Sequence, residues 1–351
     1  MNLPENRAQG WKAKLIHVSG FVDFLNPAIQ DLVGPADLII FQRNLVTAQA
    51  YDAAEYWQVM MKPVVVDLDD AYQMLPWANP AHRFWIENPE QRAPDPVTAL
   101  EEGLRRLDGL ISPNRNLLTD WAHVCRGYYL PNYARRAWWS DVPSRADLRT
   151  KRGIPEGAVI IGWGGSVSHY DAWWGSGIRE AAARICKRHP EVVWMICGND
   201  PRIYPIVPVP RDQKMQQPGV APNEWPTIVK MFDIGIAPLF GPYDQRRSWI
   251  KGLEYALAGG PWVATVGEPY RDLIGLGTQI KNGEDEWENA LEAKLRNLKK
   301  EQDAANSLIP MAQQWFVENQ IATTFKRVYD QIRMDWTQDK GRLPGIAYVI
   351  A

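Results

Sequence analysis

Residues 233–270, DIGIAPLFGPYDQRRSWIKGLEYALAGGPWVATVGEPY, predict a strand, a loop, a helix and a second strand. The first strand is the apolar run over 233–239, and the Gly-Pro pair after it marks a turn that a strand does not continue through. Over 245–258 the apolar residues recur three and four positions apart, which is the spacing of one helix face. A Gly-Gly-Pro sequence then ends the helix, and the apolar run over 261–266 supplies the second strand.

The predicted helix also carries a polar stripe. Arg247, Lys251 and Glu254 are separated by four and three residues, so they project from one side of a helix. The cations and Ser248 lie near the helix N-terminus, whose unpaired amides favour anions, and this end of the helix therefore predicts a diphosphate site. Glu254 offers two acceptor oxygens that suit the vicinal hydroxyls of a ribose. The spacing by itself favours a solvated face with an ordinary ion pair, because charged helix faces are common.

The wider string resembles the C-terminal signature of GT-B glycosyltransferases of family 4, through Ser248, Lys251 and Glu254 and the following AGGP, WVAT and EPY. In that family this segment holds the nucleotide-sugar donor. The resemblance implies that Glu254 contacts the donor ribose, that Arg247 and Lys251 lie near the diphosphate, and that transfer retains the sugar configuration. The sequence departs from the family at Arg246, where many members carry another glutamate, so the contact of that glutamate must be made otherwise or the donor differs.

A glycine-rich strand end is a second candidate for the donor side. The strand AVIIGW leads into Gly164, Gly165 and Ser166, where glycines let the backbone approach a phosphate and serine adds a hydroxyl. The loop resembles the family's GGS-x-x-H loop, which implies that these residues and His169 face the diphosphate and the transferred sugar. By residue type alone, His169 is equally well a packed or helix-capping histidine.

Two further positions are expected on the same side. Asn199 closes the predicted strand over 192–197 with a turn toward the same sheet edge. Val220 precedes a predicted helix over 225–231, where the family holds the nucleobase, and the resemblance implies a backbone contact there. Seventeen tryptophans are available for packing, and indoles also stack on sugar faces and nucleobases, as the pair 173–174 and Trp225 illustrate.

Both halves of the chain alternate apolar runs with helical stretches, which predicts parallel sheets covered by helices on both faces. The expected fold is therefore α/β, and the resemblance implies two Rossmann-like domains that face a central cleft. Expected domains are 1–134 on the acceptor side, 135–315 on the donor side, and a tail, 316–351, whose helix packs back on the N-terminal domain. The other expected strands cover 14–19, 37–43, 63–69, 109–114, 128–132, 158–163 and 278–281, and the other helices 48–60, 97–107, 175–188 and 286–302.

The acceptor side is expected at the carboxyl ends of the N-terminal strands, where parallel sheets bind ligands. Arg43, Asp69 and Asp70 lie at such ends. The string DLDD over 67–70 also resembles the metal signature of the GT-A fold, because paired carboxylates can hold Mg²⁺ or Mn²⁺. Acceptor contacts and loop capping are the other interpretations. The long connection 72–95 is rich in proline and aromatic residues, and such loops tend to be functional.

Composition narrows the class of protein. A chain of 351 residues with 46% hydrophobic and 23% charged residues is long enough for two globular domains. The net charge of -2 gives no long-range attraction to nucleic acid, and no apolar run is long enough to span a bilayer. The three cysteines have no metal-like spacing, which favours a cytoplasmic location.

These observations predict a glycosyltransferase, either a hexosyl- or a pentosyltransferase, that needs no cofactor. The donor is a nucleotide diphosphate sugar of the UDP or GDP type, and the acceptor hydroxyl belongs to a glycan, a lipid, a protein or a modified nucleobase. Two alternatives remain. One is a metal-dependent GT-A-like enzyme that uses DLDD, and the other is a non-catalytic nucleotide- or carbohydrate-binding protein, which Arg246 favours.

Overall fold

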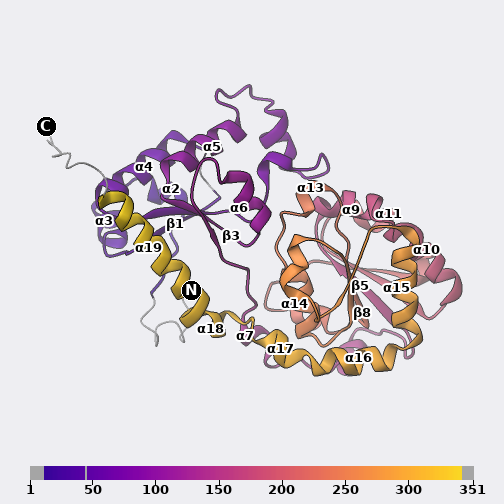
Figure 1. Cartoon of the computed structure of the whole chain (residues 1–351). Coiled ribbons are helices and arrows are strands. Elements are labelled where there is room, and N and C mark those ends of the chain that lie inside the picture. The colour runs from indigo at the N-terminus through magenta and orange to yellow at the C-terminus, as the bar shows by residue number, and fades with distance from the viewer. Residues whose placement is uncertain (1–11, 44–45, 342–351) are drawn as a thin grey trace, which may run out of the picture. The chain divides into compact units, whose positions relative to one another are not determined.

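The computed structural model describes residues 12–43 and 46–341. The chain divides into two compact units. Each unit contains one parallel sheet with helices packed on it, which confirms the predicted α/β class (Figure 1). Unit 1 comprises Met1–Asp69, Phe84–Pro131 and Gln320–Ala351, and unit 2 comprises Asp70–Arg83 and Asn132–Asn319.

The sheet of unit 1 has four parallel strands in chain order: β1 (Ile39–Gln42), β2 (Val64–Asp67), β3 (Gly109–Ser112) and β4 (Gly127–Tyr129). The central strands β2 and β3 are almost entirely buried, because their continuous apolar runs are covered on both faces. Side-chain caps fix where the neighbouring helices begin. Asp95 accepts hydrogen bonds from the first amides of α5 (Pro96–Arg106), and Thr47 does the same for α4 (Ala48–Val59).

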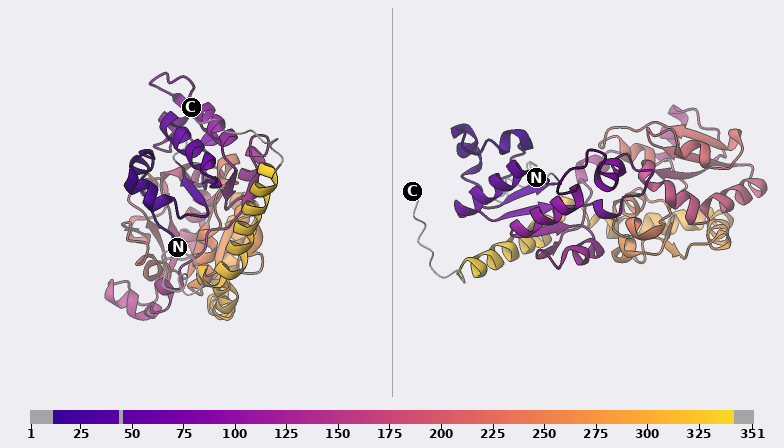
Figure 2. Two further views of the ribbon diagram at one scale, coloured as in Figure 1. Left: turned by 90° about the vertical axis from the view of Figure 1, so that its left-hand side faces the viewer. Right: turned by 90° about the horizontal axis from the view of Figure 1, so that it is seen from above.

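The long C-terminal helix α19 (Lys326–Gly341) belongs to unit 1 (Figures 1 and 2). Val328 and Ile332 on this helix are buried in one apolar cluster with Val65, Ile111 and Tyr128 of the sheet. The other helices of unit 1 are α2 (Val18–Phe21), α3 (Pro27–Val33), α6 (Arg115–Trp121) and the π-helical turns η2 (Arg83–Glu87) and η6 (Ile321–Phe325).

Unit 2 holds a six-stranded parallel sheet in the order β10-β9-β8-β5-β6-β7. Alternate residues of its strands enter two different cores. Ile160 and Met195 join the core with α12 (Trp225–Val229) and α14 (Ile250–Leu257), whereas Ile161 and Trp194 join the core with α10 (Ile178–Arg188) and α15 (Glu284–Arg296). Because successive strand side chains point to opposite faces, helices cover both faces of this sheet. The strands are β5 (Val159–Gly164), β6 (Val192–Cys197), β7 (Lys214–Gln217), β8 (Ile234–Ala237), β9 (Trp262–Thr265) and β10 (Thr278–Ile280).

Short helices complete unit 2 and connect its strands. The first group comprises η1 (Tyr72–Met74), α7 (Arg136–Trp139), α8 (Arg145–Lys151), η3 (Val167–His169), α9 (Tyr170–Gly175), α11 (Ile203–Ile206) and η4 (Arg211–Gln213). The second comprises α13 (Gly241–Asp244), η5 (Glu268–Leu273), α16 (Leu298–Ser307), α17 (Ile309–Gln313) and α18 (Val317–Gln320).

Two secondary-structure predictions are wrong. The strand expected over 14–19 is irregular chain followed by α2, because the His17 side chain accepts a hydrogen bond from the Ser19 amide and begins a helix. The helix expected over 245–258 begins only at Ile250. Asp244 is the last residue of the separate short helix α13, and its carboxylate accepts a hydrogen bond from the Phe240 amide at 2.9 Å.

The division of the chain departs from the expected domains 1–134, 135–315 and 316–351. Residues 70–83 belong to unit 2, and the chain returns to unit 1 at Gln320. Two hydrogen bonds join residues 70–83 to the rest of unit 2. The Tyr243 hydroxyl donates to the Asp70 carboxylate at 2.9 Å, and the Arg202 guanidinium donates to the Ala78 carbonyl at 3.3 Å. A sequence pattern does not reveal such long-range contacts.

Candidate functional site

Two of the predicted segments meet inside unit 2. His169 ends the turn after β5, Lys251 lies in the first turn of α14, and the Nε2 and Nζ atoms of these side chains are 3.3 Å apart. His169 is 6% exposed. The Lys251 ammonium also lies 5.0 Å from the centre of the Trp163 ring, which stabilises its charge through a cation–π contact. The glycine-rich loop and the cationic helix therefore form one cluster.

The glycines of this loop make room for aromatic rings. A Cβ atom on Gly164 would lie 2.3 Å from the Trp225 ring, and one on Gly165 would lie 2.7 Å from the Trp163 ring. Both approaches are too close for any larger residue at these positions. Ser166 is exposed, and its hydroxyl shares a 2.6 Å hydrogen bond with the Ser168 hydroxyl.

Glu254 is fixed by an indole that was not among the predicted site residues. The Trp225 Nε1 group donates to Oε2 of Glu254 at 2.8 Å. The indole ring also packs against Gly164 at the end of β5. Trp225 thus orients one carboxylate oxygen of Glu254, and the only signal for it in the sequence was the proximity of an indole to the expected nucleobase site.

Arg247 lies in the turn before α14 rather than on the predicted helix. Its guanidinium is 5.2 Å from the centre of the Tyr243 ring and 3.9 Å from the Asp244 carboxylate. The prediction of one helical stripe is therefore wrong for Arg247, although Lys251 and Glu254 do lie three residues apart on α14. Spacing gave no reason to select Tyr243 or Asp244.

Burial moves the pKa values of Lys251 and Glu254 toward neutrality and the pKa of His169 away from it. Burial lowers the pKa of Lys251 to about 7, with the Arg247 charge acting in the same direction. Burial raises the pKa of Glu254 to about 7, against the opposing effects of the Trp225 hydrogen bond and Lys251. The pKa of His169 lies well below its ordinary value because of burial and the neighbouring cations, so its imidazole is neutral. Such groups collected in one place are typical of functional sites.

Lys251→Met is expected to stabilise the protein at pH 7 by roughly 1 kcal/mol, because it removes a buried charge and keeps the aliphatic stem. The folded pKa of about 7 lies below the ordinary 10.5, so the unfolded chain binds more protons between these pH values and stability rises with pH there. This rise should become smaller in the variant. Urea unfolding from pH 7 to pH 10 measures both effects, with exposed Lys187→Met as the control. An unchanged pH dependence would contradict the prediction.

Three other predicted donor-side residues have structural partners. The side-chain amide oxygen of Asn199 accepts a hydrogen bond from the Gly219 main-chain amide at 2.7 Å, which fixes the loop that carries Val220. Val220 is partly buried against the apolar core. The Ser248 hydroxyl accepts from the Ile250 amide at 3.2 Å, at the start of α14.

The predicted acceptor-side residues separate into two groups. In unit 1, Arg43 and Asp69 form a 2.5 Å ion pair beside the end of β2. Arg43 has a positive φ of 67°, a backbone conformation that is unfavourable for arginine. Asp70 belongs to unit 2, where it binds Tyr243. Burial and the Asp69 charge raise the pKa of Asp67 to about 6.

Within residues 12–43 and 46–341, no group of three or more His, Cys, Asp or Glu side chains is placed to hold a metal ion. No described helix is long and apolar enough to cross a membrane.

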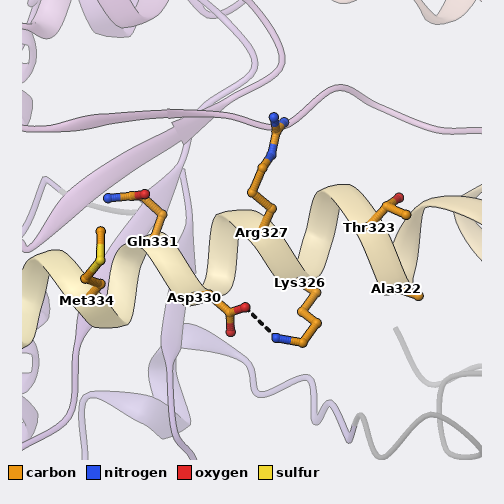
Figure 3. Close-up of a pocket in the computed structure, with 7 residues that line it drawn as sticks. All are labelled: Ala322, Thr323, Lys326, Arg327, Asp330, Gln331 and Met334. Atoms are coloured by element: carbon orange, nitrogen blue, oxygen red, sulfur yellow. Dashed lines mark hydrogen bonds and ion pairs between the residues drawn. The ribbon is translucent and has the colours of Figure 1, made fainter.

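A pocket of about 350 Å³ lies on unit 1 along η6 and α19 (Figure 3). Lys326 and Asp330 form an ion pair on one side of α19, and Arg327 extends from the other side. The lining residues are Ala322, Thr323, Lys326, Arg327, Asp330, Gln331 and Met334. None of them is a predicted site residue.

The two α/β units match solved structures that have the GT-B glycosyltransferase fold. Sucrose-phosphate synthase from Thermosynechococcus elongatus superimposes with a TM-score of 0.60 and 14% identity over 90% of this chain and 78% of that chain. HepE from Anabaena, solved with UDP-glucose, superimposes with a TM-score of 0.56 and 17% sequence identity, over 90% of this chain and 84% of that chain. A glycosyltransferase from Rickettsia africae superimposes with a TM-score of 0.58 and 11% sequence identity, over 92% of this chain and 84% of that chain. At such identities the likeness establishes the fold, and this fold is not the GT-A alternative.

The sequence matches no family model and no curated protein.

Proposed function

We propose that the protein transfers a glycosyl group from a nucleotide diphosphate sugar to an acceptor hydroxyl, with retention of configuration as in family 4. The observation that carries this proposal is the contact between His169 and Lys251, which unites the glycine-rich loop with the cationic end of α14. The GT-B fold adds support, because HepE shares it and was solved with UDP-glucose. The reaction is proposed to be cytoplasmic, where free cysteines stay reduced.

In this proposal each part of the cluster has a separate task. Arg247 and Lys251 stabilise the negative charge that develops on the departing diphosphate, together with Ser166 and main-chain amides. Glu254 accepts hydrogen bonds from the donor ribose through the oxygen that Trp225 does not occupy. Neutral His169 contacts the transferred sugar. Its Nδ1 atom is buried and has no hydrogen-bond partner among the described residues.

A non-catalytic binding protein remains the second candidate because of Arg246. This side chain donates to the Pro242 carbonyl at 2.9 Å, so it fixes the turn before α14 at the position where the resembling family often has a glutamate. The same cluster would then bind a nucleotide without turnover.

Thermal unfolding with a panel of UDP- and GDP-sugars tests the proposal. Saturation at 100 times the dissociation constant should stabilise the native state by about 2.7 kcal/mol. The nucleotide sugar that stabilises most is then incubated with glycan, lipid and protein acceptors, and release of the nucleotide diphosphate is followed. No stabilisation by any nucleotide sugar would contradict the proposal, and stabilisation without turnover would favour the binding protein.

Glu254→Gln is expected to weaken UDP binding by about 1–3 kcal/mol. The amide oxygen keeps the Trp225 hydrogen bond, but the amide NH₂ group cannot accept a hydrogen bond from a ribose hydroxyl. Calorimetric titration with UDP and GDP measures the loss. Exposed Glu156→Gln serves as the matched control and should bind like the parent. Equal affinities of Glu254→Gln and parent for every nucleotide that the parent binds would remove Glu254 from the site.

Turnover is expected to need no divalent metal or other cofactor. Arg247 and Lys251 supply fixed positive charge where the diphosphate is proposed to bind, so a metal would duplicate their effect. Donor consumption is therefore measured with and without EDTA and should be equal within error. If EDTA abolishes activity, and Mn²⁺ restores it in the parent protein but not in Asp69→Ala, the DLDD string binds a catalytic metal.

A further inference from the structure

A second pocket, of about 420 Å³, lies within unit 2 and includes none of the predicted site residues. Its volume is in the range of small-molecule sites, which are usually lined by apolar and aromatic groups with a few polar ones. We call it the aromatic pocket. It is lined by Trp77, Ala78, Tyr170, Pro201, Arg202 and Pro205.

Three segments that are far apart in sequence build the aromatic pocket: residues 77–78, Tyr170 and residues 201–205. Trp77 comes from the segment 70–83 and packs edge-to-face on Tyr170, with ring centres 5.5 Å apart. Despite this contact Trp77 is 68% exposed. An indole so exposed gains little for folding, because most of its apolar area remains in water. Its placement is therefore not explained by the core of unit 2.

The aromatic surface continues beyond the pocket. Tyr170 is followed by Trp174, with ring centres 6.1 Å apart, and Trp174 is itself 48% exposed. The Arg179 guanidinium stacks on the Trp174 ring at 3.5 Å. Tyr170 is the residue directly after His169, so the aromatic pocket adjoins the turn that carries the buried histidine.

The rim of the aromatic pocket is polar. Arg202 and Asp200 form an ion pair at 2.7 Å, and Arg202 keeps 47% of its side chain exposed. A planar guanidinium offers several N–H donors in a fixed geometry, and the carboxylate beside it offers acceptors. The pocket thus combines apolar walls with the guanidinium donors of Arg202 at one edge, and Asp200 pairs with Arg202 from outside the lining.

A pyranose ring has the matching chemistry. One face of such a ring presents C–H groups that are apolar and weakly positive, which suits the negative face of an aromatic ring, and its edge presents hydroxyls. The pocket lining contains no leucine, isoleucine, valine, methionine or phenylalanine, which are the usual partners of an apolar protein side chain.

We propose that the aromatic pocket binds a pyranose ring of a carbohydrate, with Trp77 and Tyr170 as stacking faces and Arg202 with Asp200 as hydroxyl partners. The designation of this carbohydrate as the acceptor rests on the proposed function, whereas the binding itself does not. The acceptor class that follows is a glycan or a glycosylated molecule.

Saturation-transfer NMR on the full-length protein tests this proposal with cellotriose, maltotriose, mannotriose and galactotriose as probes. At least one trisaccharide should bind the parent. Trp77→Leu keeps an apolar side chain but removes the aromatic face, and it should weaken binding about tenfold or more. Trp77→Phe should retain part of the affinity. Trp138→Leu removes an indole outside the pocket lining and should bind like the parent.

UDP affinity and sedimentation are measured on the same variants. Unchanged UDP affinity in Trp77→Leu confirms that the fold and the donor side are intact. Trisaccharide binding without UDP binding would support the carbohydrate site in the aromatic pocket and contradict the proposed function. No binding of any trisaccharide, or equal binding by parent and Trp77→Leu, would overturn the pocket assignment. Altered self-association with unchanged sugar binding would instead identify this surface as a protein contact.

Discussion

Replacing Lys251 or Arg247 by alanine is expected to lower kcat for glycosyl transfer by about 10²–10³-fold, which is the usual loss when one preorganised group that stabilises a developing anion is removed. The negative charge on the leaving diphosphate grows as the glycosidic bond breaks. A fixed cation therefore stabilises the transition state more than it stabilises the bound donor. For this reason kcat should fall further than donor affinity in both variants.

The environment of Lys251 strengthens this expectation. Its amine lies 3.3 Å from His169, over the Trp163 ring, and its pKa is lowered to about 7 by burial and Arg247. A bound diphosphate would favour the protonated amine and raise that pKa again. Since the group is already desolvated before the donor binds, little reorganisation is needed during the reaction.

The assay measures transfer at saturating donor, with circular dichroism to confirm folding. Exposed Lys187→Ala is the matched control, because trimming a solvated lysine costs almost nothing. If folded Lys251→Ala and Arg247→Ala both keep the parental kcat, the cluster is a structural feature and the active site lies elsewhere.

Asp233→Ala is expected to lower the free energy of unfolding by about 3–5 kcal/mol, as breaking a buried ion pair commonly does. Asp233 directly precedes β8 and is 4% exposed. Its carboxylate accepts hydrogen bonds from the Ile160 amide at 2.7 Å and from Gln302 at 2.8 Å. It also pairs with two arginines of α8, Arg145 and Arg149.

The loss should be large because the substitution leaves several buried donors without their acceptor. Arg145 and Arg149 are mostly buried, so removing Asp233 leaves two cations that are poorly solvated. Urea unfolding measures the change, and exposed Asp303→Ala on α16 is the control. A loss below 1 kcal/mol would show that water or other groups replace the carboxylate easily.

The two predictions are separable. The Lys251→Ala and Arg247→Ala variants should have a lower kcat but remain folded. Asp233→Ala should be less stable, but its folded fraction should still bind UDP. Asp233 makes its contacts at the opposite end of β8 from the turn that leads to Arg247. Loss of UDP binding by the folded Asp233→Ala variant would show that the Asp233 ion pairs also support the candidate site.

The strands were predictable where apolar residues run continuously. The run over 192–197 predicted β6 with its exact bounds, because a central parallel strand buries both faces and needs no alternation. The edge strand β7 (KMQQ) was not predicted, since only one of its four residues is apolar. The helix over 245–258 was predicted too long because the spacing of Ile250, Leu253 and Leu257 does not mark where the helix begins, and α14 begins only at Ile250.

Local apolar runs, glycine-rich strand ends and the spacing of Lys251 and Glu254 were enough to predict the α/β class and to nominate residues for the candidate site. Only the tertiary structure decided which residues meet. It placed His169 against Lys251, gave Glu254 its Trp225 partner and moved Asp70 onto unit 2 beside Tyr243. The physical reason is that strand and helix patterns arise from contacts within a few residues. The contacts of the site join residues from 29 to 173 positions apart, and only the packing of whole elements brings such residues together.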